Sequence, residues 1–306
     1  MSHEQIAIPT YDSIELEGRM YPAFHGGRNS GHAGQFPNSA SRIQVLNVVQ
    51  YRAFTTIVVP SSAGFAGDVT TRVAIIAHPY GFLGGSLHDH VVQALKDTLC
   101  REGVPVLLYN SRGVGKSSGR ASWTGEPERK DYQAVTDWLV SFKAKDILDF
   151  SGETKRTLEV FCCGYSYGSL MASCASLLPK NPANPDLQVV LRYILISPPL
   201  SNFIGFLLTP FRSGQFMKAL ERIISRDAEQ SLVISSGEAK ARALIAYGTR
   251  DTFTQTETYR SQVQKLFAQP GVAANRVSVV EVRDADHFWS DPRCKSELMG
   301  AVSQWL

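Results

Sequence analysis

The order of apolar and polar residues divides the chain into an N-terminal part and a longer part that begins near residue 73. Residues 6–9 and 14–20 alternate apolar and polar side chains, which is typical of half-buried strands, with a turn at 10–13. After residue 73 the apolar runs are continuous, which predicts strands buried on both faces of a parallel sheet. These runs are 73–77, 104–109, 158–163, 189–196, 243–247 and 277–282.

Helical spacing between these runs predicts the helices that cover the sheet. Apolar residues recur every three or four positions in 91–99, 132–142, 169–178, 259–267 and 294–305. Ser86, with Asp89 three residues later, fits a capping box and predicts the start of the first of these helices. The alternation of strand and helix predicts an α/β fold with a doubly wound, mostly parallel sheet.

Two segments depart from this alternation. Residues 25–69 begin with a stretch rich in glycine, serine, asparagine and proline, which predicts a surface loop. Residues 200–240 carry several phenylalanines, among them Phe206 and Phe211, and are long enough for a short helical cap or lid outside the sheet. The chain of 306 residues is close to the roughly 250–300 residues at which folded domains begin to split, so we expect a single domain over residues 1–306.

Composition and charge limit the kinds of binding partner that we expect for this chain. The 31 basic and 28 acidic residues leave a formal net charge of +3, which gives no reason to expect nucleic acid or an anionic membrane as partner. No apolar run approaches the roughly 20 residues needed to span a bilayer. Five cysteines, an odd number, and an N-terminus without a secretory pattern favour a cytoplasmic location. A homodimer stays open as the assembly.

The residues 164–168 read Gly-Tyr-Ser-Tyr-Gly and fit the pattern G-x-S-x-G. The pattern follows a predicted strand directly and leads directly into a predicted helix. That setting is typical of a nucleophile elbow, where a sharp turn exposes the serine above the end of the sheet. Glycines flank such a serine because the strand and helix backbones come too close for a Cβ atom. We therefore expect Ser166 to be a catalytic nucleophile.

A serine hydroxyl needs a neighbouring base. His287 follows the last predicted strand, and the carboxyl ends of parallel strands meet at the edge where ligands bind, so we expect His287 to be that base. Asp251, which follows the strand 243–247, is expected to fix the tautomer of the imidazole. Asp284 and Asp286 are rivals, but carboxylates so near His287 in sequence are less able to reach its Nδ1.

An oxyanion hole requires two backbone N–H groups that point to the developing negative charge. Tyr167, the residue after the candidate nucleophile, should supply one. The loop after the strand 73–77 should supply the other, and because Pro79 has no N–H, Tyr80 is the first candidate and Gly81 the second.

Two further motifs do not carry the chemistry they suggest. Residues 113–117 end in Gly-Lys-Ser, but a phosphate-binding loop needs glycine where Asn110 stands. His88 and His90 could suggest a metal pair, but residues two apart on a helix do not face each other. We therefore expect no metal and no cofactor.

Taken together, the motifs identify a family resemblance. They are His78-Pro79 with Gly84-Gly85, then 111–119 (Ser-Arg-Gly-Val-Gly-Lys-Ser-Ser-Gly), 164–168, Gly248 to Asp251, and 285–288 (Ala-Asp-His-Phe). Over residues 73–306 the chain resembles compact α/β-hydrolases related to dienelactone hydrolases and to the catalytic domain of Xaa-Pro dipeptidyl-peptidases. The resemblance implies an eight-stranded, mostly parallel sheet and a triad in the order Ser166, Asp251, His287. Compared with that family, residues 25–69 look like an insertion within the N-terminal strands.

The expected function is hydrolysis of a carboxylic ester or thioester, with amides also open, through an acyl-enzyme on a small molecule such as a specialised metabolite. A catalyst of cyclisation or condensation in natural-product biosynthesis and a non-catalytic binding scaffold are the alternatives. The fold does not fix the substrate. Aromatic side chains near the expected rim suggest an apolar or aromatic acyl group. The candidate substrate-binding residues are Gly81, Trp123, Phe206, Phe211 and Phe288.

Overall fold

The computed structural model describes residues 3–24, 69–148, 156–176, 187–200, 213–224, 242–269 and 276–306. The expected insertion at 25–69, apart from residue 69, lies outside the described residues, as do Phe206 and Phe211. Within the described part, the α/β prediction and the eight-stranded sheet are confirmed.

The sheet has the strand order β1-β2-β4-β3-β5-β6-β7-β8. The hairpin of β1 and β2 is antiparallel, and β2 also pairs antiparallel with β4, whereas every pair from β4 to β8 is parallel. Parallel strands need a crossover connection, usually a helix, and this requirement produces the layers described below. The strands are β1 Glu4–Pro9, β2 Glu15–Tyr21, β3 Val69–Ala77, β4 Val106–Tyr109, β5 Arg156–Tyr165, β6 Leu187–Ile196, β7 Ala243–Arg250 and β8 Val277–Asp286.

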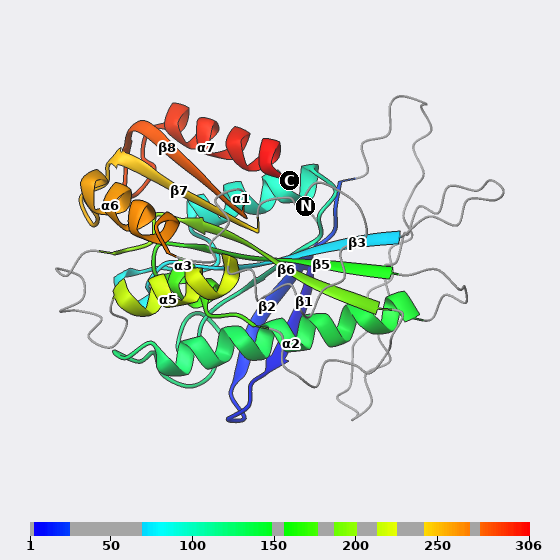
Figure 1. The fold of residues 1–306 in the computed structure, drawn as a ribbon. Coiled ribbons are helices and arrows are strands. Elements are labelled where there is room, and N and C mark those ends of the chain that lie inside the picture. Colours follow the sequence, from blue (N-terminus) through cyan, green and yellow to red (C-terminus); the bar gives the residue numbers. More distant parts are fainter. Residues whose placement is uncertain are drawn as a thin grey trace, which may run out of the picture.

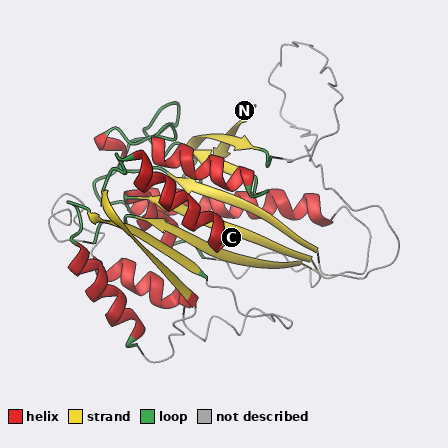
Figure 2. Ribbon diagram, turned by 90° about the horizontal axis from the view of Figure 1, so that it is seen from above, coloured by secondary structure: helices red, strands yellow, loops and turns green. Residues whose placement is uncertain are grey.

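Helices cover both faces of this sheet (Figure 1). One hydrophobic core lies under α1 and α7, and a second lies under α2, α3, α5 and α6. In Figure 2 the strands fan out beneath the helices, as expected of a twisted sheet. The helices are η1 Gly81–Leu83, a single 3₁₀ turn, α1 His90–Arg101, α2 Glu126–Leu148, α3 Tyr167–Ser173, α5 Ser213–Ile224, α6 Thr256–Phe267 and α7 Pro292–Trp305.

Two predicted helix boundaries were wrong. Helix α1 begins at His90, because the carboxylate of Asp89 accepts hydrogen bonds from the N–H groups of Val91 and Val92 and makes Asp89 the N-cap. Among the described residues, the Ser86 hydroxyl accepts from His88 N–H in the loop before α1 and from no N–H of the helix, so Ser86 does not begin the helix. Helix α3 ends at Ser173, short of the predicted residue 178.

The described part of the expected cap, α5, packs onto the body of the protein. Phe216 in this helix is 1% exposed and belongs to the core that also holds α3 and α6. At this phenylalanine the aromatic character of the segment therefore reflects packing. That residues 200–240 form a lid stays a prediction.

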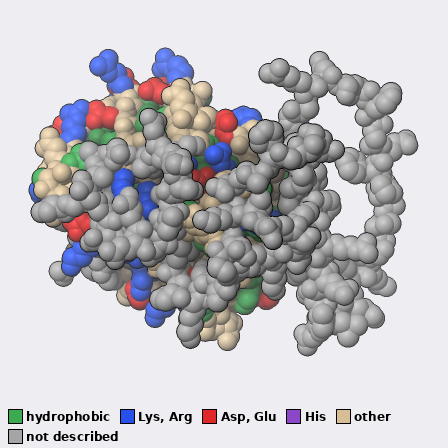
Figure 3. All heavy atoms as spheres, turned by 45° about the vertical axis from the view of Figure 1, so that its right-hand side comes forward, with side chains coloured by type: hydrophobic (Ala, Val, Ile, Leu, Met, Phe, Trp, Pro, Cys, Tyr) green, Lys and Arg blue, Asp and Glu red, His purple; other side chains and the backbone are tan. Residues whose placement is uncertain are grey.

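The exposed surface carries both signs of charge. In Figure 3 lysine and arginine side chains alternate with aspartate and glutamate over the face that is coloured by residue type. In the described ranges, no helix has both the length and the apolar character that crossing a bilayer requires.

Candidate active site

Ser166 lies at the turn between β5 and α3 in a strained backbone conformation. Its φ of 52° and ψ of −122° are rare for a residue with a side chain. The Ser166 N–H donates to Ile196 O in the neighbouring strand at 2.8 Å, which fixes the turn to β6. In this conformation the side chain of Ser166 is half-buried.

The glycines on either side permit this turn. A Cβ atom on Gly164 would lie 2.1 Å from Gly168 O, and one on Gly168 would lie 2.3 Å from Ala77 O. Real Cβ atoms do not approach backbone oxygens so closely. The prediction that close backbone contacts require both glycines is confirmed.

His287 directly follows β8 and reaches the serine. Its Nε2 lies 2.9 Å from Ser166 Oγ, and its side chain is almost completely buried. The hydroxyl of Tyr165, the residue before the serine, donates to the carbonyl of His287 at 2.9 Å. The backbone beside the imidazole is therefore tied to the strand that carries Ser166.

Asp251 follows β7 and completes a line of three side chains. Its Oδ2 lies 2.8 Å from His287 Nδ1. Its Oδ1 accepts hydrogen bonds from the N–H groups of Phe253 at 2.8 Å and Thr254 at 3.0 Å. Of the rival carboxylates, Asp286 accepts instead from Ser290 N–H at 2.9 Å. The structure thus brings Asp251 to the imidazole.

Tyr259 of α6 supports the same carboxylate. Its hydroxyl lies 3.3 Å from Asp251 Oδ2 and 2.9 Å from Pro198 O. Burial, followed by the nearby negative charge of Asp251, raises the pKa of Tyr259 well above its ordinary value. The phenol therefore remains protonated and can donate to the carboxylate.

Two backbone N–H groups face no protein acceptor in the part of the chain described. They belong to Tyr167, the first residue of α3, and to Tyr80, which precedes η1. The two residues are neighbours, because their rings lie 4.8 Å apart. Gly81, the second candidate, packs against the next loop, and a Cβ atom there would lie 2.6 Å from Val114 Cγ2.

His78 holds this loop in place. Its Nδ1 lies 2.6 Å from Pro79 O, and its Nε2 accepts from Ser111 N–H at 2.9 Å, which joins the loops after β3 and β4. Burial lowers the pKa of His78 to about 4, so the ring is neutral near pH 7. Nδ1 then donates and Nε2 accepts, as both contacts require.

A row of four aromatic rings leads from the serine turn to the surface. The centroids of Tyr167 and Tyr80 lie 4.8 Å apart, those of Tyr80 and Phe82 5.2 Å, and those of Phe82 and Trp123 4.5 Å. We call these four residues the aromatic row. Phe82 is 45% exposed and Trp123 60% exposed, although their rings are stacked. The buried hydroxyls of Tyr80 and Tyr167 have no partner among the described residues.

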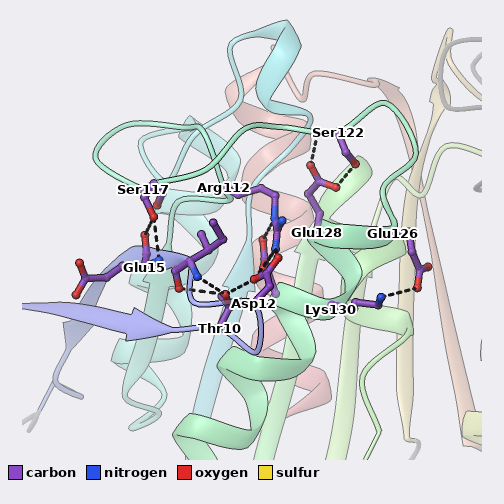
Figure 4. A network of polar contacts seen from close by, with 12 residues as sticks. Thr10, Asp12, Glu15, Arg112, Ser117, Ser122, Glu126, Glu128 and Lys130 are labelled. Carbon is purple, nitrogen blue, oxygen red and sulfur yellow. Dashed lines mark hydrogen bonds and ion pairs between the residues drawn. The ribbon is translucent and has the colours of Figure 1, made fainter.

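Polar contacts fix the loop that carries Trp123 (Figure 4). Glu128 accepts from both the N–H and the hydroxyl of Ser122, the residue before the tryptophan, at 2.5 Å each. At the other end of the loop, Arg112 forms ion pairs with Asp131 of α2 and with Asp12 of the β1–β2 turn. The exposed indole therefore stands on an anchored loop.

A second aromatic group surrounds the imidazole. The ring of Phe253 stacks on that of His287, with centroids 4.1 Å apart, and Phe288 meets both rings edge-on. Phe288 was a sequence-predicted site residue, whereas Phe253 and Phe82 were missed. Phe253 stands two residues after Asp251, and Phe82 two residues after Tyr80. Their closeness to chosen residues was the one signal that could have found them.

Comparisons with known proteins agree with this architecture. Residues 54–191 match the model of the family described as X-Pro dipeptidyl-peptidase (S15 family). An uncharacterized protein of Schizosaccharomyces pombe is 21% identical over 240 residues, which cover 78% of this chain and 86% of that protein.

Solved structures with similar folds include several hydrolases. An α/β serine hydrolase homologue of Coxiella burnetii superimposes with a TM-score of 0.56 at 18% identity, covering 99% of this chain and 97% of that one. The esterase Pf2001 of Pyrococcus furiosus gives 0.57 at 17% identity, with 100% and 90% covered. Est1E of Butyrivibrio proteoclasticus, solved with ferulic acid bound, gives 0.51 at 13% identity, with 98% and 96% covered. These likenesses show the α/β-hydrolase fold.

Proposed function

We propose that this chain, which has the α/β-hydrolase fold, is a serine hydrolase that cleaves carboxylic esters or thioesters through an acyl group on Ser166. One observation carries the proposal. Ser166 Oγ, His287 and Asp251 form a continuous line of hydrogen bonds, at 2.9 Å from Oγ to Nε2 and 2.8 Å from Nδ1 to Oδ2. A serine with a positioned base, and a base with a positioned carboxylate, is the arrangement that activates a hydroxyl.

In the acylation step, His287 Nε2 takes the hydroxyl proton as Ser166 Oγ forms a bond to the substrate carbonyl carbon. Asp251 holds the imidazole with Nδ1 protonated and stabilises the imidazolium. When the tetrahedral intermediate collapses, the bond to the leaving oxygen or sulfur breaks and His287 returns the proton to it. The product of this step is an ester of the serine.

The negative charge on the carbonyl oxygen needs donors that are already oriented. The N–H groups of Tyr167 and Tyr80 suit this role, because neither has a protein acceptor among the described residues and their rings are in contact. Deacylation repeats the sequence with water as the nucleophile, which His287 deprotonates. The carboxylic acid then leaves and Ser166 is restored.

The aromatic row supports a substrate with an apolar or aromatic acyl group. A row of rings that begins beside the oxyanion donors and ends half-exposed provides apolar surface next to the reacting carbon. The buried hydroxyls of Tyr80 and Tyr167, which have no partner among the described residues, favour a polar substituent on that group. Est1E, which has the same fold, was solved with the aromatic acid ferulic acid. We assign Trp123, Gly81 and Phe288 to the substrate-binding site.

Amide cleavage is a second candidate because of the family match over residues 54–191. Ester and amide substrates pass through the same kind of acyl-enzyme and differ in the bond that is broken to form it. The relative rates on a p-nitrophenyl ester and an Xaa-Pro p-nitroanilide therefore separate the two activities. Cyclisation or condensation would replace water with a nucleophile on the substrate, and product masses would reveal it. A binding scaffold would not need the hydrogen-bond line.

The test is turnover of p-nitrophenyl esters of increasing acyl length by wild type and Ser166→Ala. Losing a triad member costs about 10⁴- to 10⁶-fold in kcat. Ser169→Ala is the matched control. It removes the hydroxyl of another buried serine, which donates to Ser166 O, and leaves the Ser166 hydroxyl in place. Retention of more than about a tenth of the wild-type rate in Ser166→Ala would exclude nucleophilic catalysis by this residue.

A further inference from the structure

The imidazole of His287 has an aromatic ring on its face as well as hydrogen bonds at both nitrogens. The ring of Phe253 lies 4.1 Å from it between centroids, and the two planes differ by 23°. The imidazole is 2% exposed, whereas Phe253 is half-buried. The phenylalanine therefore stands between one face of the base and the solvent.

The turn that holds Asp251 also sets the position of this ring. Asp251 Oδ1 accepts from Phe253 N–H at 2.8 Å, so carboxylate and ring are joined by one short hydrogen-bonded loop. The next residue, Thr254, donates from its hydroxyl to Pro198 O at 3.4 Å and accepts from Leu200 N–H at 2.8 Å. The loop after β6 thus fixes the turn from the other side.

Phe288 limits the remaining freedom of the stack. Its ring meets Phe253 at 87° with centroids 5.5 Å apart, and it meets His287 at 89° and 5.6 Å. Edge-to-face contacts of this kind are favourable and directional. The plane of the imidazole is consequently fixed by two aromatic rings in addition to its hydrogen bonds.

We propose that Phe253 is a positioning residue for the base. Its ring holds the imidazole in the line between Ser166 and Asp251, and its π face stabilises the imidazolium that forms when the serine proton is transferred. This inference rests on the proposed function. A cation over an aromatic face is attracted by the ring quadrupole, more strongly where water is excluded. The attraction between the ring and the imidazolium exists only while His287 is charged. It therefore lowers the barrier to the acylation step without strengthening substrate binding.

The experiment compares Phe253→Leu with Phe253→Tyr. Leucine keeps an apolar side chain but removes the π face, whereas tyrosine retains it. Phe267→Leu is the matched control, because this phenylalanine is partly exposed at the end of α6. The substrate is p-nitrophenyl acetate, whose short acyl group has little apolar surface to bind the site.

We expect Phe253→Leu to lower kcat by about 3- to 30-fold with KM changed less than about twofold. Phe253→Tyr should keep at least about half of the wild-type kcat, and Phe267→Leu should match wild type. Thermal unfolding of each variant separates this effect from a loss of folded protein.

Three outcomes would overturn the inference. A wild-type kcat in Phe253→Leu would show that the ring has no effect on the base. A raised KM with unchanged kcat would make Phe253 a wall of the substrate site. Equal losses in the leucine and tyrosine variants would make it packing alone. Ser166→Ala, measured on the same substrate, distinguishes these outcomes from failure of the proposed function, because only that failure leaves it active.

Discussion

Ser166, the proposed nucleophile, and His287, the proposed base, are held in place by different means. Ser166 is positioned by its backbone, which takes a φ of 52° in a turn so tight that a Cβ atom on either flanking glycine would collide with backbone oxygens. His287 and Asp251 are positioned by contacts of their side chains. The carboxylate of Asp251 has four hydrogen-bond contacts, and the ring of His287 stacks on that of Phe253. Steric exclusion therefore controls one half of the site and hydrogen bonding and stacking control the other.

This difference predicts how each half fails. A substitution of either flanking glycine has no small effect, because backbone atoms cannot move apart without separating β3, β5 and α3. A substitution around the imidazole leaves the fold intact and lowers the rate. Asp251→Asn tests the imidazole half of this contrast, and Gly168→Ala tests the serine half. Changes at His78 and Trp123, outside both halves, should have smaller effects.

Asp251→Asn should have the largest effect. An amide cannot hold the protonated Nδ1 in the required tautomer, so we expect kcat to fall by about 10⁴-fold while the protein stays folded. Asp286→Asn is the control, because Asp286 accepts from Ser290 N–H and does not contact the ring, and it should keep its rate within about threefold. Equal losses in the two variants would move the acid to the loop beside His287.

Gly168→Ala should be the most damaging change for stability. The new methyl group would lie 2.3 Å from Ala77 O, and relieving such overpacking costs about 3 kcal/mol or more of the free energy of unfolding. Gly300→Ala in α7 is the control, because it meets nothing within 4 Å and should gain up to about 1 kcal/mol. Urea denaturation measures both. A loss below about 1 kcal/mol at position 168 would contradict the steric account.

His78 should make stability depend on pH below neutrality. Burial lowers its pKa to about 4 in the folded state, whereas the unfolded value is about 6.5. Between these values the unfolded chain binds the extra proton, so the free energy of unfolding falls as pH drops from about 6.5 to 4, by roughly 3 kcal/mol in total. This contribution is fully present above pH 6.5.

The measurement is urea denaturation at pH 7 and pH 5 for wild type, His78→Gln and His88→Gln. The position 88 variant is the control, because that side chain is exposed. We expect a smaller difference between the two pH values in His78→Gln alone. The same difference in all three proteins would show that His78 is not the titrating group.

Trp123→Ala should have the smallest effect. Removing the exposed end of the aromatic row should raise KM about tenfold for esters with long or aromatic acyl groups and little for acetate. Phe267→Ala is the control for loss of an exposed ring. Identical chain-length profiles in Trp123→Ala and wild type would remove Trp123 from the substrate site.

The sequence predicted the half of the site that depends on the backbone in more detail than the half that depends on side chains. A strand, a glycine-flanked serine and a helix are consecutive, so the serine turn could be read locally. His287 and Asp251 could be placed by the rule that parallel strands end at one edge. The stack of Phe253 on His287 could not, because loops after two different strands create it and no periodicity marks their side chains.

The fold shows the same limit. Buried strands have continuous apolar runs, so β3 to β8 were found, although their ends extend beyond the runs at several positions. The start of α1 was misplaced because Ser86 and Asp89 both fit a cap, and only the carboxylate lies where it accepts from two backbone N–H groups. Phe82 was missed because its contact with Trp123 joins residues about forty positions apart.

The proposed function requires that Ser166 is the nucleophile that forms the acyl-enzyme. The most direct measurement is the intact mass of the protein after reaction with a fluorophosphonate, followed by peptide mapping of the adduct. We predict one adduct per chain on Ser166 and none in Ser166→Ala. An adduct on another residue, or equal labelling of the alanine variant, would show that Ser166 is not the nucleophile.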